Sequence, residues 1–404
     1  MKKISLGILA LIILGLIFSQ IPPIKSRLSW KIEVAKTYLR GVVNPVDAVP
    51  TAKPTNTPVN LSSPTVAATL ALSATPTIEP TASATPEPLP SQVSLAVPDY
   101  EMQDMNNCGP ASLTMGLRYY GWDGDQFDIS EVIKPIPQDR NVNPEEMIYY
   151  VRNYAGWLRA EYRVNGNLPL LKKLIAAGYP VLIEETFHFD EPYYPNDDLW
   201  AAHYMLLTAY DDEDGAFTGQ DSYHGANQRI PYETLEEDWQ PFNHVYLVAY
   251  LPEDEEELAL LLGDDWDEEK NRERALEASQ RATEENPDDA FAWFNLGSNL
   301  LYFEKYAQSA NAYDQARSLG LPQRMMRYQF GAFIASFQDH RTEDLLSLTD
   351  YALQRTPNSE EALLWRGWGL YQQGDYDGAI ASWELALKHR PNYFDAEYAL
   401  DFVR

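Results

Sequence analysis

The chain has 404 residues, the length of two or three folded domains. Its 60 acidic and 31 basic residues give a formal net charge of −29, and no run clusters Lys and Arg as phosphate binding requires. We therefore expect no nucleic-acid partner. Hydrophobic residues make up 45% of the chain, enough for ordinary cores, so the acidity belongs to the surface rather than to global disorder.

The chain begins with an apolar run. Residues 4–21 follow two lysines and are almost wholly apolar, which is about the minimum length for a membrane-spanning helix. No small-residue cleavage site appears near Ser19, so residues 1–25 are predicted to be an uncleaved membrane anchor, with a cleaved signal as the alternative. Residues 26–43 are predicted to form a short amphipathic helix whose basic side chains face lipid headgroups.

Residues 44–98 are rich in Pro, Thr, Ala and Ser and are predicted to be a disordered linker. The basic residues after the apolar run favour a cytoplasmic location by the positive-inside rule. A long stalk between an anchor and folded domains is more typical of the outer face of a cell envelope. We expect a single-pass anchor with the folded domains on the extracellular side, or a secreted protein if the segment is cleaved.

Residues 253–404 carry an internal repeat. Pro287, Pro322, Pro357 and Pro391 recur at intervals of 35, 35 and 34 residues, and each ends a helical pattern. This period predicts an all-α solenoid of stacked helical hairpins. The region resembles about three to four tetratricopeptide repeats, and two units match the family pattern well through the following residues: Trp293, Leu296, Gly297, Tyr313 and Ala316, and Gly367, Gly374, Ala379, Trp383 and Ala386.

By this resemblance, the array would bind a protein partner along a concave face that includes Phe294, Tyr302, Trp368 and Tyr371. The alternative is that the array packs against the first domain and binds nothing else. The acidic run 253–257 at the start of this region is interpreted as a solvated face, because its spacing matches no calcium loop. We expect no metal site and no cofactor.

Residues 99–252 contain the only cysteine, Cys108. It stands between Asn107 and Gly109-Pro110, just before apolar residues at helical spacing. Cys108 is therefore predicted to lie at a helix N-terminus, where the helix dipole favours a thiolate. Position alone leaves two options open, a nucleophile and a structural cysteine.

A thiol nucleophile needs a base and a group that orients the base. His203 directly precedes a buried-strand pattern, residues 204–210, and after a turn a second short strand ends at Asp221. An antiparallel hairpin would bring His203 and Asp221 side by side, as a Cys-His-Asp triad requires. Taken alone, His203 is more simply explained as a histidine at the end of a strand, and Asp221 as an aspartate in a turn.

Together, these motifs resemble the bacteriocin-processing type of papain-like cysteine peptidase, family thirty-nine, in its stand-alone "like" branch. The resemblance rests on the start Gln103 to Leu113, the step 178–181, the pair His203-Tyr204 and Asp221. It implies an α+β papain-like domain with Cys108 as nucleophile, His203 as general base, Asp221 as orienting carboxylate and Gln103 as oxyanion donor.

Two departures from the family pattern loosen the alignment. Gln103 lies five residues before Cys108 where the family has six, and Ser222 follows Asp221 where proline is common. We expect an envelope-facing cysteine peptidase that hydrolyses a peptide or amide bond, with repeats that recruit a substrate or partner. The alternatives are a catalytically silent binding scaffold and an enzyme of acyl transfer or peptidoglycan hydrolysis.

Overall fold

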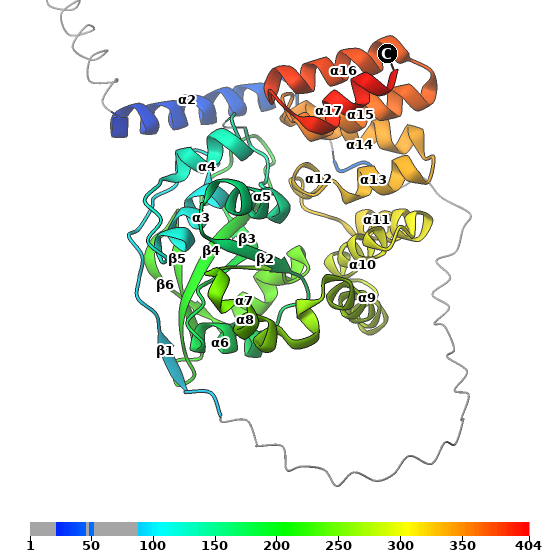
Figure 1. Cartoon of the computed structure of the whole chain (residues 1–404). Coiled ribbons are helices and arrows are strands. Elements are labelled where there is room, and N and C mark those ends of the chain that lie inside the picture. Colours follow the sequence, from blue (N-terminus) through cyan, green and yellow to red (C-terminus); the bar gives the residue numbers. More distant parts are fainter. Residues whose placement is uncertain (1–21, 46–47, 52–87, 137, 404) are drawn as a thin grey trace, which may run out of the picture.

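The computed structural model describes residues 22–45, 48–51, 88–136 and 138–403 (Figure 1). The predicted anchor segment 4–21 and most of the predicted linker lie outside the described residues. Helix α2 (Pro22–Val43) covers the segment predicted to be an amphipathic helix. No helix among the described residues is both long enough and apolar enough to cross a membrane.

In the described part of the chain, seven strands form one antiparallel sheet with the order β2-β7-β3-β4-β5-β6, and β1 pairs with the far end of β4. The strands are β1 (Gln92–Ser94), β2 (Arg159–Arg163), β3 (Val181–His188), β4 (Trp200–Asp211), β5 (Ala216–Asp221), β6 (Gly225–Pro231) and β7 (Tyr246–Tyr250). The register places Glu185 opposite His203 and Met205 opposite Asp221.

Strand β1 corrects the predicted linker, which extended to residue 98. Val93 pairs with Tyr210, and the N–H of Leu95 donates to the carbonyl of Thr208 at 2.9 Å. A strand of three residues with one apolar side chain has no periodicity that a sequence pattern could reveal. The folded domain therefore begins before residue 99.

Helices cover both faces of the sheet, which is why β4 is hydrophobic along nearly its whole length. One face packs against α3 (Cys108–Arg118), α4 (Gln126–Ile133) and α5 (Pro144–Tyr154). The other packs against α6 (Leu168–Ala176), α7 (Tyr232–Trp239) and α8 (Glu255–Leu262). Helix α8 lies beyond the domain boundary predicted at residue 252, but its Leu258 and Leu262 are buried in the core of this first domain.

The rest of the chain is helical. Its helices are α9 (Glu268–Glu285), α10 (Ala290–Tyr302), α11 (Tyr306–Leu319), α12 (Met325–Tyr328), α13 (Gly331–Gln338), α14 (Thr342–Arg355), α15 (Glu360–Gln373), α16 (Tyr376–His389) and α17 (Phe394–Val403). Gly367 allows α15 and α16 to approach closely, because a Cβ there would lie 2.2 Å from Nε1 of Trp383. Together, the two parts form a mixed α/β domain followed by a helical repeat region.

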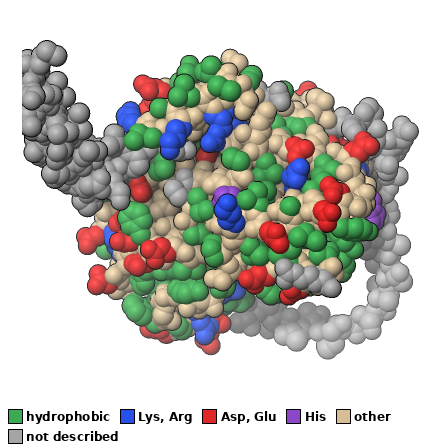
Figure 2. Space-filling model, turned by 90° about the horizontal axis from the view of Figure 1, so that it is seen from above, with side chains coloured by type: hydrophobic (Ala, Val, Ile, Leu, Met, Phe, Trp, Pro, Cys, Tyr) green, Lys and Arg blue, Asp and Glu red, His purple; other side chains and the backbone are tan. Residues whose placement is uncertain are grey.

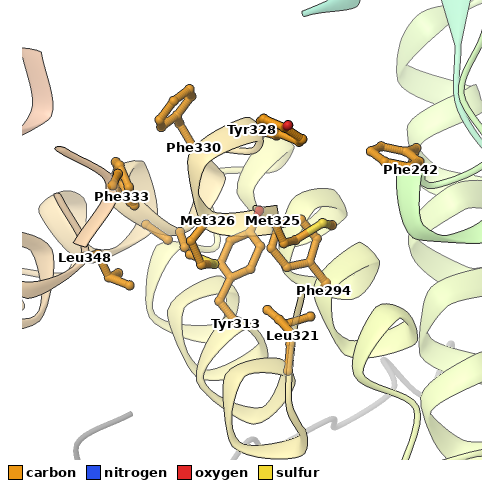
Figure 3. Packing of buried hydrophobic residues seen from close by; sticks show 14 of the residues in the cluster. Phe242, Phe294, Tyr313, Leu321, Met325, Met326, Tyr328, Phe330, Phe333 and Leu348 are labelled. Carbon is orange, nitrogen blue, oxygen red and sulfur yellow. The ribbon is translucent and has the colours of Figure 1, made fainter. Parts of the chain in front are cut away.

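The repeats pack against the first domain through a shared hydrophobic cluster (Figure 3). Phe242 and Trp200 of the first domain lie in one cluster with Phe294, Met325 and Tyr328 of the repeats. The ring of Trp200 stacks on that of Phe242 with centroids 5.7 Å apart. The array therefore packs on the first domain, as the first part of the alternative stated above expects, and the repeats lie beside the end of the sheet where β4 begins.

Acidic and basic side chains both lie on the face that Figure 2 draws. The face drawn in Figure 2 shows basic side chains in small groups among acidic and hydrophobic ones, with many acidic side chains near its edges. The acidic side chains seen on this face are exposed, in agreement with the expectation that the acidity belongs to the surface.

Candidate active site

Cys108 is the first residue of α3, as the sequence pattern predicts. Residues 109–117 of this helix are buried, and Ser112 Oγ anchors the helix to β4 by donating to the carbonyl of Tyr204 at 2.7 Å. Gly109 keeps the first turn close to its neighbours, since a Cβ there would lie 3.2 Å from Val142 Cβ. The packing therefore presents a partly buried thiol at a helix N-terminus beside β4.

His203 lies between Cys108 and Asp221. The Nε2 atom of His203 is 2.9 Å from Asp221 Oδ1, and a second hydrogen bond joins the imidazole to the Cys108 thiol. Asp221 also accepts the backbone N–H groups of Tyr223 at 2.7 Å and His224 at 3.1 Å. These backbone donors hold the carboxylate in place, and the carboxylate in turn orients the imidazole.

The electrostatics favour an ion pair between the thiol and the imidazole. Burial alone would raise the pKa of Cys108, but the hydrogen bond and charge of His203, together with the charge of Lys134, lower it below that of a free thiol. Burial opposes protonation of His203, but its hydrogen bonds to Asp221 and Cys108 raise its pKa to about 10. Both shifts favour a thiolate beside an imidazolium.

Gln103 lines the same cavity as Cys108 and His203. Its backbone N–H donates to the carbonyl of Ser222 at 2.9 Å, and its Oε1 accepts from Ser222 Oγ at 3.0 Å. This leaves the Nε2 amide as the end that can donate toward a substrate oxygen. The serine that departs from the family's proline thus orients the glutamine.

The structure adds site residues that sequence reasoning did not single out. His224 Nδ1 lies 2.8 Å from Asp221 Oδ2, and the Lys134 ammonium bonds to the carbonyl of Asn106. Burial, followed by the charge of Arg140, lowers the pKa of Lys134 to about 8. His224 stands three residues after Asp221, a spacing that could have drawn attention to it, whereas nothing in the local sequence marks Lys134.

The cavity at the thiol is small, about 40 Å³, and we call it the thiol cavity. It is lined by the following residues: Gln103, Asn106, Cys108, Asp139, Arg140, Asn141, Phe187, Phe189, Ala201, Ala202, His203, Tyr223 and Tyr328. Tyr328 belongs to the repeat region, and its hydroxyl donates to Asp139 Oδ1 at 2.6 Å. The repeats therefore form part of the wall of the thiol cavity.

The predicted partner-binding residues do not form one surface. Phe294 and Tyr302 line a cavity of about 530 Å³ between the repeats and the first domain, which we call the interdomain cavity. Trp368 and Tyr371 pack against Trp383 and Phe402 in the last hairpin and line none of the cavities described here. Helix α17 covers this end of the array, and the sequence pattern of the repeats did not include that helix.

No group of three or more His, Cys, Asp and Glu side chains in the described part of the chain is arranged to hold a metal ion. The side chains gathered at the thiol are an imidazole, a carboxylate and a primary amide, which are the groups that acyl transfer through a cysteine would use.

Two protein-family models match parts of the chain. Residues 91–247 match the model of the Peptidase_C39 like family, and residues 360–393 match the tetratricopeptide repeat model. The family match begins one residue before β1 and ends within β7, so it spans the sheet. The chain therefore carries a Peptidase_C39-like domain followed by a tetratricopeptide repeat region.

Individual similar proteins cover parts of the chain. Over 122 residues it is 29% identical to the cytochrome c-type biogenesis protein CycH of Pseudomonas aeruginosa, a match that spans 30% of each protein. A putative C39-like peptidase from Bacillus anthracis has 17% identity and a TM-score of 0.31, over 39% of this chain and 97% of that one. Xylellain, a cysteine protease from Xylella fastidiosa, has 15% identity and a TM-score of 0.30, over 41% and 87%.

Proposed function

We propose that this protein is a cysteine peptidase that hydrolyses a peptide or amide bond with Cys108 as nucleophile. The observation that carries the proposal is the position of His203, hydrogen-bonded to Cys108 on one side and to Asp221 Oδ1 at 2.9 Å on the other. A structural cysteine would have no need of a buried imidazole and a buried carboxylate arranged in this order.

The groups suggest a two-step reaction. The Cys108 thiolate attacks the carbonyl carbon, while the Gln103 amide and the Cys108 N–H hold the developing oxyanion. The imidazolium of His203 then gives its proton to the leaving amine, which leaves a thioester on Cys108. A water molecule that gives its proton to His203 hydrolyses the thioester, releases the acid and restores the thiolate and imidazolium.

The experiment is incubation of the full-length protein, in mild detergent, with a peptide library that contains Gly-Gly pairs and with muropeptides. Hydrolysis adds the mass of one water across the products, whereas acyl transfer to an amine adds the amine instead. We expect hydrolysis with the wild-type protein and none with Cys108→Ala. Turnover that persists in Cys108→Ala, or its absence from every substrate with wild type, would contradict the proposal.

We also propose that the folded domains lie on the extracellular side of a membrane anchored by the apolar N-terminal segment. The support is the apolar run at residues 4–21 followed by a long Pro- and Thr-rich segment. Protease added to intact cells should then remove the peptidase domain while a cytoplasmic marker survives. Protection of the domain in intact cells, with cleavage only after lysis, would contradict this orientation.

The repeats are proposed to recruit a substrate or partner at the interdomain cavity. The support is that Phe294 and Tyr302 line it beside Tyr162 of the first domain. Tyr302 is partly exposed, so Tyr302→Ala should weaken binding of a peptide identified in the library without loss of folding. Unchanged affinity in a calorimetric titration would rule out this surface.

A further inference from the structure

A second cavity adjoins the thiol cavity. It has a volume of about 320 Å³ and shares three wall residues with the thiol cavity, namely Asn106, Asp139 and Phe189. Three parts of the chain enclose it: α2, the first domain and the repeats. We call it the arginine cavity, because its lining includes Arg40, Arg324, Arg327 and Arg355.

Several buried polar atoms of this lining have no hydrogen-bond partner within the described structure. The donors are Arg327 Nη2, Arg355 Nε and Nη1, and Tyr194 Oη, and one acceptor, Gln138 Oε1, is also unbonded. Arg324 Nε makes no hydrogen bond but lies 3.6 Å from Asp139 Oδ2 in an ion pair. The side chains of Arg327, Arg355 and Tyr194 are each at most 8% exposed. Leaving a buried donor unpaired costs free energy, and buried polar groups are nearly always paired. So many unpaired groups around one cavity therefore point to a ligand that accepts hydrogen bonds.

Other atoms of Arg324 and Arg327 are well satisfied, so the unbonded atoms of these two side chains are not signs of poor packing. Arg324 binds Asp197 through both terminal nitrogens, at 2.5 and 2.8 Å. Arg327 Nη1 donates to Asp139 Oδ2 at 3.0 Å and to Thr356 Oγ1 at 3.1 Å. These bonds fix two guanidinium groups in position at the cavity wall.

Arg355 is different, because it makes no ion pair with any described residue. Its guanidinium lies over the ring of Tyr194, 4.3 Å from the ring centroid. Among the described residues, its hydrogen bond is a contact of 3.5 Å from Nη2 to the carbonyl of Asn44. Burial, together with the charges of Arg327 and Arg40, lowers its pKa. A stacked guanidinium with no carboxylate is prepared for bidentate binding of a planar anion.

The position of α2 is consistent with an enclosed subsite. Gly41 of this helix lies so close to the first domain that a Cβ there would come within 2.7 Å of Tyr194 Cβ. Val34, Thr37 and Arg40 of the same helix line the cavity. An anion bound there would be shielded from water, which strengthens its interaction with the arginines.

We propose that the arginine cavity is a subsite for a carboxylate group of the peptide substrate, held chiefly by Arg355 and Arg327. This inference rests on the proposed function, because it assigns the substrate class of the same site. The carboxylate comes either from the C-terminus of a short peptide or from an acidic side chain near the scissile bond. Both have the planar geometry that a guanidinium recognises.

The test is first made as binding, without turnover. Full-length protein carrying Cys108→Ala is titrated calorimetrically with four probes: N-acetyl-Gly-Gly-Ala as free acid and as amide, and the amides of N-acetyl-Gly-Gly-Glu and N-acetyl-Gly-Gly-Gln. We expect one acid of the two pairs to bind about 10- to 100-fold more tightly than its neutral partner, the ratio typical of a charged hydrogen bond. The pair that shows the ratio identifies the source of the carboxylate.

The same titration is repeated with Arg355→Met, Arg355→Lys and a control, Arg366→Met. Arg366 lies on α15 and pairs with Asp350 at 2.9 Å, away from the arginine cavity. Arg355→Met should abolish the preference for the acid, Arg355→Lys should keep part of it, and Arg366→Met should leave it unchanged. Equal binding of acid and neutral probes, or a preference that survives Arg355→Met, would overturn the subsite. So would tighter binding of inorganic phosphate than of either acid.

A kinetic arm separates this proposal from the proposed function. With wild-type protein, the preference should appear in KM, and iodoacetamide should alkylate Cys108 equally fast in wild type and Arg355→Met. Binding that depends on the carboxylate without hydrolysis of any peptide would refute the peptidase and retain the subsite. Hydrolysis with no difference between acid and neutral substrates would refute the carboxylate subsite and retain the peptidase.

Discussion

Replacing His203 by alanine should slow the alkylation of Cys108 most strongly at mildly acidic pH. The variant loses the hydrogen bond and the positive charge that hold the thiolate, while burial of the thiol remains. A free thiol with a pKa of about 8.5 is only about 0.3% ionised at pH 6. Full ionisation of the thiol would therefore raise the alkylation rate at most about 300-fold. A thiolate of lower pKa is intrinsically less nucleophilic, which we take to reduce the gain by up to about tenfold.

The expected loss in the second-order rate with iodoacetamide is therefore about 30- to 300-fold at pH 6, and it should shrink above pH 9 as an isolated thiol ionises. The rate is measured from pH 5 to 10 by mass spectrometry of the alkylated protein. His188→Ala is the matched control, because His188 is an exposed residue at the end of β3. A wild-type profile that follows free cysteine, or one that His203→Ala leaves unchanged, would refute the ion pair.

Four further substitutions test individual side chains of the site, the repeats and the arginine cavity. Ser222→Ala removes the hydroxyl that orients Gln103, so kcat should fall roughly 5- to 10-fold while iodoacetamide reactivity stays unchanged; an unchanged kcat would exclude this role. Gly367→Ala forces a Cβ against Trp383, so the free energy of unfolding should fall by about 1–3 kcal/mol in a urea titration, and an unaltered midpoint would contradict the close packing. Burial opposes ionisation of Asp139, but the charges of Arg327 and Arg324 lower its pKa to about 2, so its contribution to stability is present above about pH 4 and lost as pH falls toward 2. Asp139→Asn should therefore flatten acid unfolding over that range, and an identical acid profile would show that the pair contributes nothing. Arg355→Met removes a buried cation with no ion-pair partner, so without ligand the melting temperature should rise, and a fall would show that the arginine is already satisfied.

The hydrolysis rate should fall at high pH even though alkylation does not. The pKa of His203 is raised to about 10, so above that pH the imidazolium loses the proton that the leaving amine requires. Alkylation needs only the thiolate and should remain fast. Peptide hydrolysis and iodoacetamide rates measured on the same protein from pH 8 to 11 test this, and parallel profiles would contradict the assigned role of His203.

Local patterns were sufficient to predict the center of the candidate site. Cys108 is placed at the start of α3 by the polar turn before it and the apolar residues at helical spacing after it. His203 and Asp221 meet because they stand near the start of one strand and at the end of the next in a hairpin. The repeat period likewise predicted the paired helices α10 with α11 and α15 with α16. Each of these inferences depends on residues close together in the sequence.

The sequence by itself thus determined the two-part architecture and the elements that carry Cys108, His203 and Asp221. Only the tertiary structure decided that Tyr328 of the repeats would close the thiol cavity, and that Arg324, Arg327 and Arg355 would surround a second cavity beside it. The physical reason is sequence distance. Asp139 meets Arg327 across 188 residues, and such a contact depends on how two whole domains bury their surfaces against each other. The local sequence pattern does not predict this contact between the domains. From the pattern of their own helices alone, these arginines would be expected on a solvent-exposed face.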